Sequence, residues 1–143
     1  MYAIIDIETT GGDYDEEGIT EIAIYQYDGC KITDQFCSLV NPKKQIQPFV
    51  KKLTGINEKM LKNAPAFFEV AKRIIEITNN CIIVAHNAAF DYRILKTEFK
   101  RIGYAYERKT ICTITLSKEL LPNQKVFSLG IPVLGICYGM QLM

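Results

Sequence analysis

The first ten residues constrain this chain more than any other stretch. Tyr2–Ile7 is a short apolar run rich in β-prone residues, and a Thr-Thr-Gly-Gly turn follows Glu8. The run is too short for a typical helix and predicts a buried strand. On a strand, Asp6 and Glu8 project from the same face because they are two residues apart.

Two carboxylates held side by side resist ionising, and a divalent cation relieves that repulsion. Carboxylate oxygens are hard ligands suited to Mg²⁺ or Mn²⁺. The pattern Asp6-x-Glu8 therefore indicates a candidate metal site. The alternative is an exposed strand end whose two acids are simply solvated.

A chain of 143 residues is expected to form one domain around one core. Its 48% hydrophobic and 23% charged residues are typical of a globular protein. No apolar run approaches the ~20 residues needed to cross a bilayer, and no signal peptide is recognisable at the N-terminus. These features predict a cytoplasmic protein without a membrane partner.

The five cysteines are odd in number and include no C-x-x-C pair. This argues against a disulfide framework and against a zinc site. We expect most of them to be reduced, buried, small apolar side chains. Charge is also unevenly placed, because acidic residues crowd positions 6–21 whereas lysine and arginine dominate positions 96–109.

Three strands joined by short connections are expected in the first 40 residues, at Tyr2–Ile7, near Glu21–Tyr27 and at about Ile32–Val40. Asp28-Gly29 is a hairpin turn signal, so the three strands should form an antiparallel meander. Residues 41–65 are predicted as loop with short helical turns, held by Pro42, Pro48 and Gly55.

Helices and strands should alternate in the remainder of the chain. A helix with Pro65 in its first turn should end at Asn79-Asn80, its apolar face being Phe67, Val70, Ala71, Ile74 and Thr78. A strand at Cys81–Ala85 should lead into a helix that stops at Gly103 and carries Leu95, Phe99 and Ile102. A strand near Ile111 and a helix at Leu116–Leu121 follow. The order β-β-β-α-β-α-β-α predicts an α/β fold, a mixed sheet with helices packed against it.

A third carboxylate, Asp91, lies in VAHNAAFDYRIL, where a strand turns into a helix. Alone it reads as an acid favoured by the helix dipole. Together, DIETTG and HNAAFD resemble the first two motifs of the DEDD (DnaQ-like) 3′–5′ exonuclease family, and the chain looks most like the proofreading epsilon subunits of bacterial DNA polymerase III. LTGINEKMLKNAPAF and KTICTITLSKELLP match the family's intervening and following stretches, so the resemblance covers about residues 2–130.

The resemblance implies an RNase H-like fold with a mixed five-stranded sheet. It also implies that Asp6, Glu8 and Asp91 are the catalytic residues and hold two divalent cations, Mg²⁺ or Mn²⁺. Two such ions, about 3.5–4 Å apart, would stabilise the attacking and leaving oxygens of phosphodiester hydrolysis.

The same resemblance implies a substrate site for the single-stranded 3′ end of DNA or RNA, with a DNA polymerase as a candidate partner. Thr9 and Thr10 would lie beside the 3′-hydroxyl, and His86 and Asn87 would support the second motif. Ile56 and Phe90 would pack on the last bases, as sequence-neutral stacking requires. The alternative for Ile56 and Phe90 is an ordinary place in the core.

The family's third motif, H-x-x-x-x-D or Tyr-x-x-x-Asp, is absent from these 143 residues. The only histidine is His86, and no aspartate follows Asp91. We therefore expect residues 1–130 to be a C-terminally truncated exonuclease domain with impaired turnover. A module that binds single-stranded nucleic acid without cleaving it is the alternative.

The ending IPVLGICYGMQLM, residues 131–143, resembles the nucleophile region of class I glutamine amidotransferases such as GMP synthetase. In that setting a tight turn between glycines exposes Cys137 at the start of a helix, which lowers the thiol pKa. Those enzymes also need a histidine and a glutamate further along the chain. A glutaminase fragment is therefore a third hypothesis, with Cys137 expected to be inactive in a foreign-looking tail.

Overall fold

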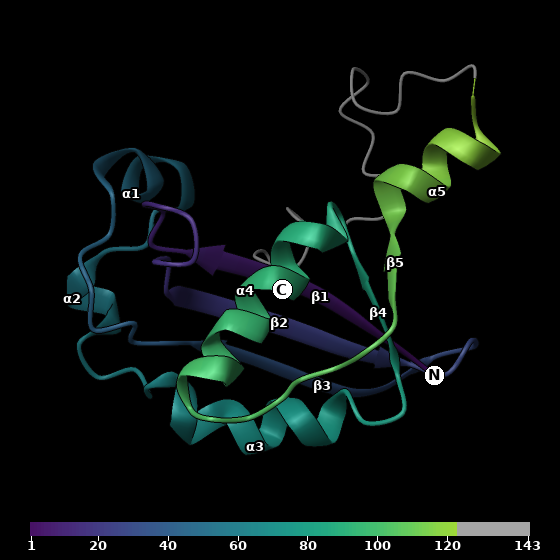
Figure 1. Ribbon diagram of the computed structural model, residues 1–143, viewed down its shortest axis with the longest axis horizontal. Coiled ribbons are helices and arrows are strands. Elements are labelled where there is room, and N and C mark those ends of the chain that lie inside the picture. Colours follow the sequence, from purple (N-terminus) through teal and green to yellow (C-terminus); the bar gives the residue numbers. More distant parts are fainter. Residues whose placement is uncertain (123–143) are drawn as a thin grey trace.

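The computed structural model describes residues 1–122, and its central feature is a mixed five-stranded sheet (Figure 1). The strand order is β3-β2-β1-β4-β5. The strands are β1 (Tyr2–Thr9), β2 (Ile19–Tyr27), β3 (Ile32–Leu39), β4 (Ile82–Ala85) and β5 (Thr110–Cys112). The helices are α1 (Pro48–Thr54), α2 (Glu58–Leu61), α3 (Phe67–Ile77), α4 (Ala88–Arg101) and α5 (Thr113–Leu120).

The predicted meander and α/β class are confirmed. β1 pairs antiparallel with β2, and β2 pairs antiparallel with β3, whereas β4 is parallel to both β1 and β5. Asp28 stabilises the turn between β2 and β3, because its side chain accepts hydrogen bonds from the backbone N–H groups of Cys30 and Lys31 at 2.8 and 2.9 Å. In the part of the chain described, no helix is both long and apolar enough to span a membrane.

The main core lies between one face of the sheet and helices α3 and α4. Residues Ala3, Ile5 and Ile7 alternate along β1 and are 0–5% exposed, as a strand with one face in the core requires. The two helices lie close to each other on the sheet (Figure 1). The rings of Phe67 in α3 and Phe99 in α4 pack edge to face, with 5.0 Å between their centroids.

The start of α3 differs from the prediction. The helix begins at Phe67 after the N-cap residue Ala66, so Pro65 lies outside its first turn. The Glu69 side chain accepts a hydrogen bond from the Ala66 backbone N–H at 2.7 Å and fixes this start. This one-sided cap satisfies the Ala66 N–H, and the Glu69 N–H donates in turn to the Ala66 backbone carbonyl at 3.0 Å. Thr78, predicted on the apolar face, is the C-cap residue.

Helix α4 buries Leu95 and Phe99 as predicted, but Ile102 does not belong to its core face. Ile102 is the C-cap residue and is 43% exposed. The chain turns away there, and Tyr106 takes the buried place instead, stacking on Phe99 at 4.4 Å between ring centroids. The Tyr106 hydroxyl donates to Thr78 Oγ1 at 2.9 Å.

A second, smaller core lies under α1 and α2, which are the short helical turns expected in residues 41–65. Its buried side chains are Ile46, Val50, Ile56 and Leu61. Pro48 occupies the start of α1, and Gly55 ends it with a φ of 76°, a left-handed conformation that glycine adopts without a Cβ clash. We call residues 46–61 the α1–α2 unit.

Several boundaries and burials also differ from the sequence prediction. β1 continues through Thr9, and α5 starts three residues earlier than expected, at Thr113. The cysteines among the described residues are free, but only Cys81 is buried, and Cys30 and Cys37 are exposed. The tail 131–143 and its Cys137 lie outside the described residues.

Candidate functional site

The three carboxylates singled out from the sequence come from two elements. Asp6 and Glu8 lie half-buried on β1, and Asp91 lies in the first turn of α4, where it is 4% exposed. β4 runs parallel beside β1 and leads into α4 through His86 and Asn87. The turn from β4 into α4 therefore brings the start of α4 to β1 (Figure 1), where the Asp91 carboxylate accepts a backbone hydrogen bond from Ile7.

The carboxylates influence one another electrostatically. Burial raises the pKa of Asp91 to about 8, the negative charge of Asp6 adds to this rise, and the charge of Glu8 contributes less. Backbone hydrogen bonds at Asp91 and Ile7 oppose the rise in its pKa. The positions predicted from two separate motifs therefore share one electrostatic environment.

A divalent cation fits this group in chemistry and in charge. The donors are hard carboxylate oxygens, and a nearby cation favours the ionised form that burial and repulsion disfavour. Within residues 1–122, however, no three histidine, cysteine, aspartate or glutamate side chains are arranged so that they could hold one metal ion together. For all three carboxylates to bind one ion, their side chains must turn toward a common point.

Thr9 and Thr10 shape the turn that follows β1. They are 8% and 1% exposed. Thr9 Oγ1 accepts a hydrogen bond from the Gly11 N–H at 3.2 Å, and Thr10 Oγ1 accepts one from the Gly18 N–H at 3.1 Å. Both hydroxyls thus hold the loop formed by residues 10–18, and their predicted contact with a 3′-hydroxyl stays a prediction.

Helix α1 is docked directly against this turn. The Gln47 N–H donates to the Thr10 carbonyl at 2.9 Å. Gly11 has a φ of 65°, and a Cβ placed there would lie 2.8 Å from Val50 Cγ2, so only glycine allows this close approach. The end of the carboxylate strand and the start of α1 therefore form one packed junction.

His86 and Asn87 connect the second motif to its surroundings. His86 Nδ1 lies 3.0 Å from Thr113 Oγ1, which links the end of β4 to the start of α5. Asn87 adopts a left-handed conformation with a φ of 69°, and its carbonyl accepts a hydrogen bond from the Phe90 N–H at 2.8 Å. This bend sets the direction in which α4 leaves the sheet.

The two predicted base-stacking residues occupy core positions. Ile56 is 4% exposed and belongs to the small core. Phe90 is half-buried against the main core, with the Arg93 guanidinium 5.5 Å from its ring centroid. Ile56 therefore occupies an ordinary core position, which was the alternative to base stacking. The Phe90 ring is still partly exposed to solvent.

The acidic run at the start of the chain has a structural partner that sequence reasoning missed. Arg93 pairs with Glu17 at 2.7 Å and with Asp15 at 3.0 Å. The hydrogen bond from Arg93 lowers the pKa of Glu17, which is 8% exposed. The crowding of acidic residues at positions 6–21 was the available signal that a cationic partner lies nearby. These pairs fasten the 10–18 loop to α4.

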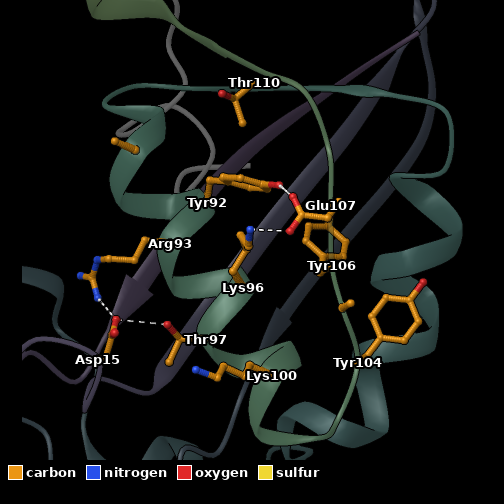
Figure 2. Close-up of a pocket in the computed structure, with 12 residues that line it drawn as sticks. Asp15, Tyr92, Arg93, Lys96, Thr97, Lys100, Tyr104, Tyr106, Glu107 and Thr110 are labelled. Carbon is orange, nitrogen blue, oxygen red and sulfur yellow. Dashed lines mark hydrogen bonds and ion pairs between the residues drawn. The ribbon is translucent and has the colours of Figure 1, made fainter.

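A cavity of about 690 Å³ lies between α4 and residues 104–110 (Figure 2). Figure 2 shows Lys96 reaching Glu107, an ion pair of 2.5 Å, and Tyr92 donating to the same carboxylate at 3.1 Å. Two of the three cations on its wall, Arg93 and Lys96, are paired with carboxylates, and Lys100 is the third. The cavity therefore offers little free positive charge for a phosphate.

Residues 3–133 match the exonuclease family RNase_T. The chain is 38% identical over 128 residues to a PolC-type DNA polymerase III of Caldanaerobacter subterraneus subsp. tengcongensis, covering 90% of this chain and 9% of that protein. It is 37% identical over 130 residues to the 3′-5′ exonuclease DinG of Staphylococcus aureus, covering 90% of this chain and 14% of that protein. The chain thus spans a small part of each relative.

Solved structures agree with the fold. Exonuclease X, in complex with 5′ overhanging duplex DNA, superimposes with a TM-score of 0.69 and 33% identity, covering 87% of this chain and 67% of that one. Escherichia coli Exonuclease I, in complex with an oligonucleotide, gives a TM-score of 0.72 at 16% identity, covering 85% of this chain and 30% of that one, a likeness of fold alone. The predicted RNase H-like architecture of an exonuclease is confirmed.

Proposed function

The chain belongs to the exonuclease family, and from this premise we propose that it is a metal-dependent 3′–5′ exonuclease-type domain acting on nucleic-acid 3′ ends. One observation carries the proposal: the half-buried acids of β1 and the buried Asp91 share one electrostatic environment at the turn from β4 into α4. One relative, DinG, is a 3′-5′ exonuclease, which supports hydrolysis in that direction.

Asp6, Glu8 and Asp91 would hold the metal, two Mg²⁺ or Mn²⁺ ions in this proposal. Bound there, such ions supply charge stabilisation for the attacking and leaving oxygens of a phosphodiester. The chain's own residues fix the geometry around them. Burial holds Asp91 in place, and the 10–18 loop is fastened on one side by Arg93 and on the other by α1.

The substrate would be a single-stranded 3′ end, and DNA is the first choice because Exonuclease X, 33% identical to this chain, was solved in complex with 5′ overhanging duplex DNA. A polymerase partner is suggested by the PolC-type relative. Both remain proposals, as does the division into a domain at residues 1–130 and a tail at 131–143.

Turnover by residues 1–143 alone should be slow. No H-x-x-x-x-D or Tyr-x-x-x-Asp motif follows Asp91 in this sequence. Positioned acid–base catalysis typically contributes ~10²–10⁴-fold, and the missing motif would provide it. The second candidate function, a module that binds single strands without cleaving them, is favoured by this absence.

The test compares the 143-residue chain with a completed chain whose residues from Ile131 onward are replaced by a family-like ending that contains H-x-x-x-x-D. The assay is release of mononucleotides from a 3′-labelled oligonucleotide with Mg²⁺ or Mn²⁺. We expect little release from the 143-residue chain. The completed chain should release mononucleotides ~10²-fold faster or more. Asp6→Asn should abolish release, whereas Asp13→Asn, in the exposed part of the 10–18 loop, should not.

Thermal melting with Mn²⁺ separates metal binding from turnover. Mn²⁺ should raise the Tm of the unaltered chain by mass action and leave Asp6→Asn unaffected. An inactive completed chain that also ignores Mn²⁺ would overturn the proposal. Equal rates for the two chains would show that the missing motif is dispensable.

A further inference from the structure

An exposed aromatic ring stands beside the end of the carboxylate strand. Phe49, the second residue of α1, is 65% exposed. Its Cζ atom lies 3.4 Å from the position that a Cβ on Gly11 would occupy. Gly11 is three residues beyond Glu8, so at most about 11 Å of backbone separates their Cα atoms. The ring therefore borders the candidate site.

The helix that carries Phe49 is fixed in place. Hydrogen bonding of Gln47 to Thr10 ties the start of α1 to the turn after β1. Val50, the next residue, is 7% exposed and packs into the small core. A ring presented from an anchored helix start loses little further freedom when it contacts a ligand.

The segment that carries this ring is rich in lysine. Residues 43–62 contain six lysines and a single acid, Glu58, whose partner is Lys51 at 2.6 Å. Lys52 is exposed on α1. Grooves that bind single strands combine cations that follow the phosphates with aromatic rings on which bases stack. The cavity beside α4 lacks this combination, because two of its three cations are already paired.

We propose that Phe49 is a base-stacking residue: its ring receives a nucleobase near the 3′ end, and the lysines beside it contact the strand's phosphates. The inference rests on the proposed function. The family resemblance implied this stacking role for Ile56, but Ile56 is buried in the small core. We assign the role to the exposed ring of Phe49 instead. Stacking on one ring accepts any base, which suits an enzyme that removes nucleotides regardless of sequence.

The first test measures the Kd of a fluorescent single-stranded oligonucleotide by anisotropy, in EDTA so that hydrolysis is prevented. Phe49→Ala should raise the Kd about 5- to 150-fold, the range for loss of one base stack. Phe68→Ala is the matched control, because Phe68 is 64% exposed on α3 and belongs to the other side of the fold. The control should change the Kd less than about twofold. Both variants should keep the unaltered Tm.

The second test uses the absence of tryptophan from this chain. In a Phe49→Trp variant the new indole preserves stacking, and its emission should be quenched when the oligonucleotide binds. A series of oligonucleotides, each lacking the base at one position, then locates the contact. The indole emission should be quenched less when the missing base is the one that stacks on residue 49. Emission from a Phe68→Trp variant should not respond.

The outcomes separate the two proposals. If the unaltered chain binds no oligonucleotide, the proposed function and this inference both fall. If it binds, and either Phe49→Ala binds equally well or the Phe49→Trp emission is unquenched, only the stacking role is overturned.

Discussion

The main core and the α1–α2 unit differ in how many side chains they bury. The main core consists of aromatic and branched side chains that are almost wholly buried, such as Ile5, Ile74 and Phe99, each 0% exposed. The α1–α2 unit buries only four side chains and leaves Phe49 and Leu53 65% and 71% exposed. The deep core positions carboxylates, whereas the shallow unit presents apolar and cationic side chains to solvent.

The 10–18 loop joins these two regions. On one side it packs on α1 through the contact of Gly11 with Val50. On the other side Glu17 pairs with Arg93 of α4. The main core carries most of the buried apolar side chains, whereas the proposed strand contacts lie on the α1–α2 unit, so variants should be able to change stability without changing binding, and the reverse.

The largest expected effect is loss of stability from the main core. Phe99→Ala removes a ring that stacks on Tyr106 and should lower the free energy of unfolding by about 3–5 kcal/mol. Leu61→Ala, in the small core, should cost about 2 kcal/mol because a shallow site can relax around the lost volume. Urea titrations measure both. Equal losses would erase the distinction between the two cores.

An intermediate effect concerns the pair that fastens the loop. Arg93→Met leaves the buried Glu17 carboxylate without its partner. The free energy of unfolding should fall by about 1–3 kcal/mol at about pH 7, a loss between those typical of exposed and of buried ion pairs. Arg73→Met, whose partner Asp34 is half-exposed, is the matched control and should cost less than about 1 kcal/mol.

The same variant has a predicted pH dependence. Arg93 lowers the pKa of Glu17 in the folded state, so this pair contributes stability above the unfolded pKa and loses it as the pH falls through the folded value. The difference in unfolding free energy between Arg93→Met and the unaltered chain should therefore shrink below about pH 4. A difference that stays constant across this range would mean that packing, and not the ion pair, fastens the loop.

The smallest effect concerns a single phosphate contact. Lys52→Ala should weaken oligonucleotide binding modestly and reduce the slope of log Kd against log salt by about 0.7, the value for one single-strand contact. Lys72→Ala, on α3, removes a lysine whose side chain is 89% exposed and should leave that slope unchanged. The same slope for both variants would mean that the α1–α2 unit does not face the strand.

Local patterns predicted most of the elements. The apolar run before Asp6, the Asp28-Gly29 turn and the spacing of Leu95 and Phe99 are signals carried by neighbouring residues, and each appears in the structure as expected. Two of the errors fell at helix ends, and the expected burial of most cysteines was also wrong. Pro65 and Ile102 lie just outside their helices because a cap or a turn of the chain, formed with residues nearby in space, decided the boundary.

The sequence by itself determined which carboxylates are present, their spacing on β1, and the element order that carries Asp91 to them. Only the tertiary structure decided that Ile56 is buried while Phe49 is exposed, and that Glu17 pairs with a residue 76 positions away. The physical reason is that periodicity and propensity are set by adjacent residues, whereas burial, pKa and ion pairing are set by whatever distant segment packs alongside.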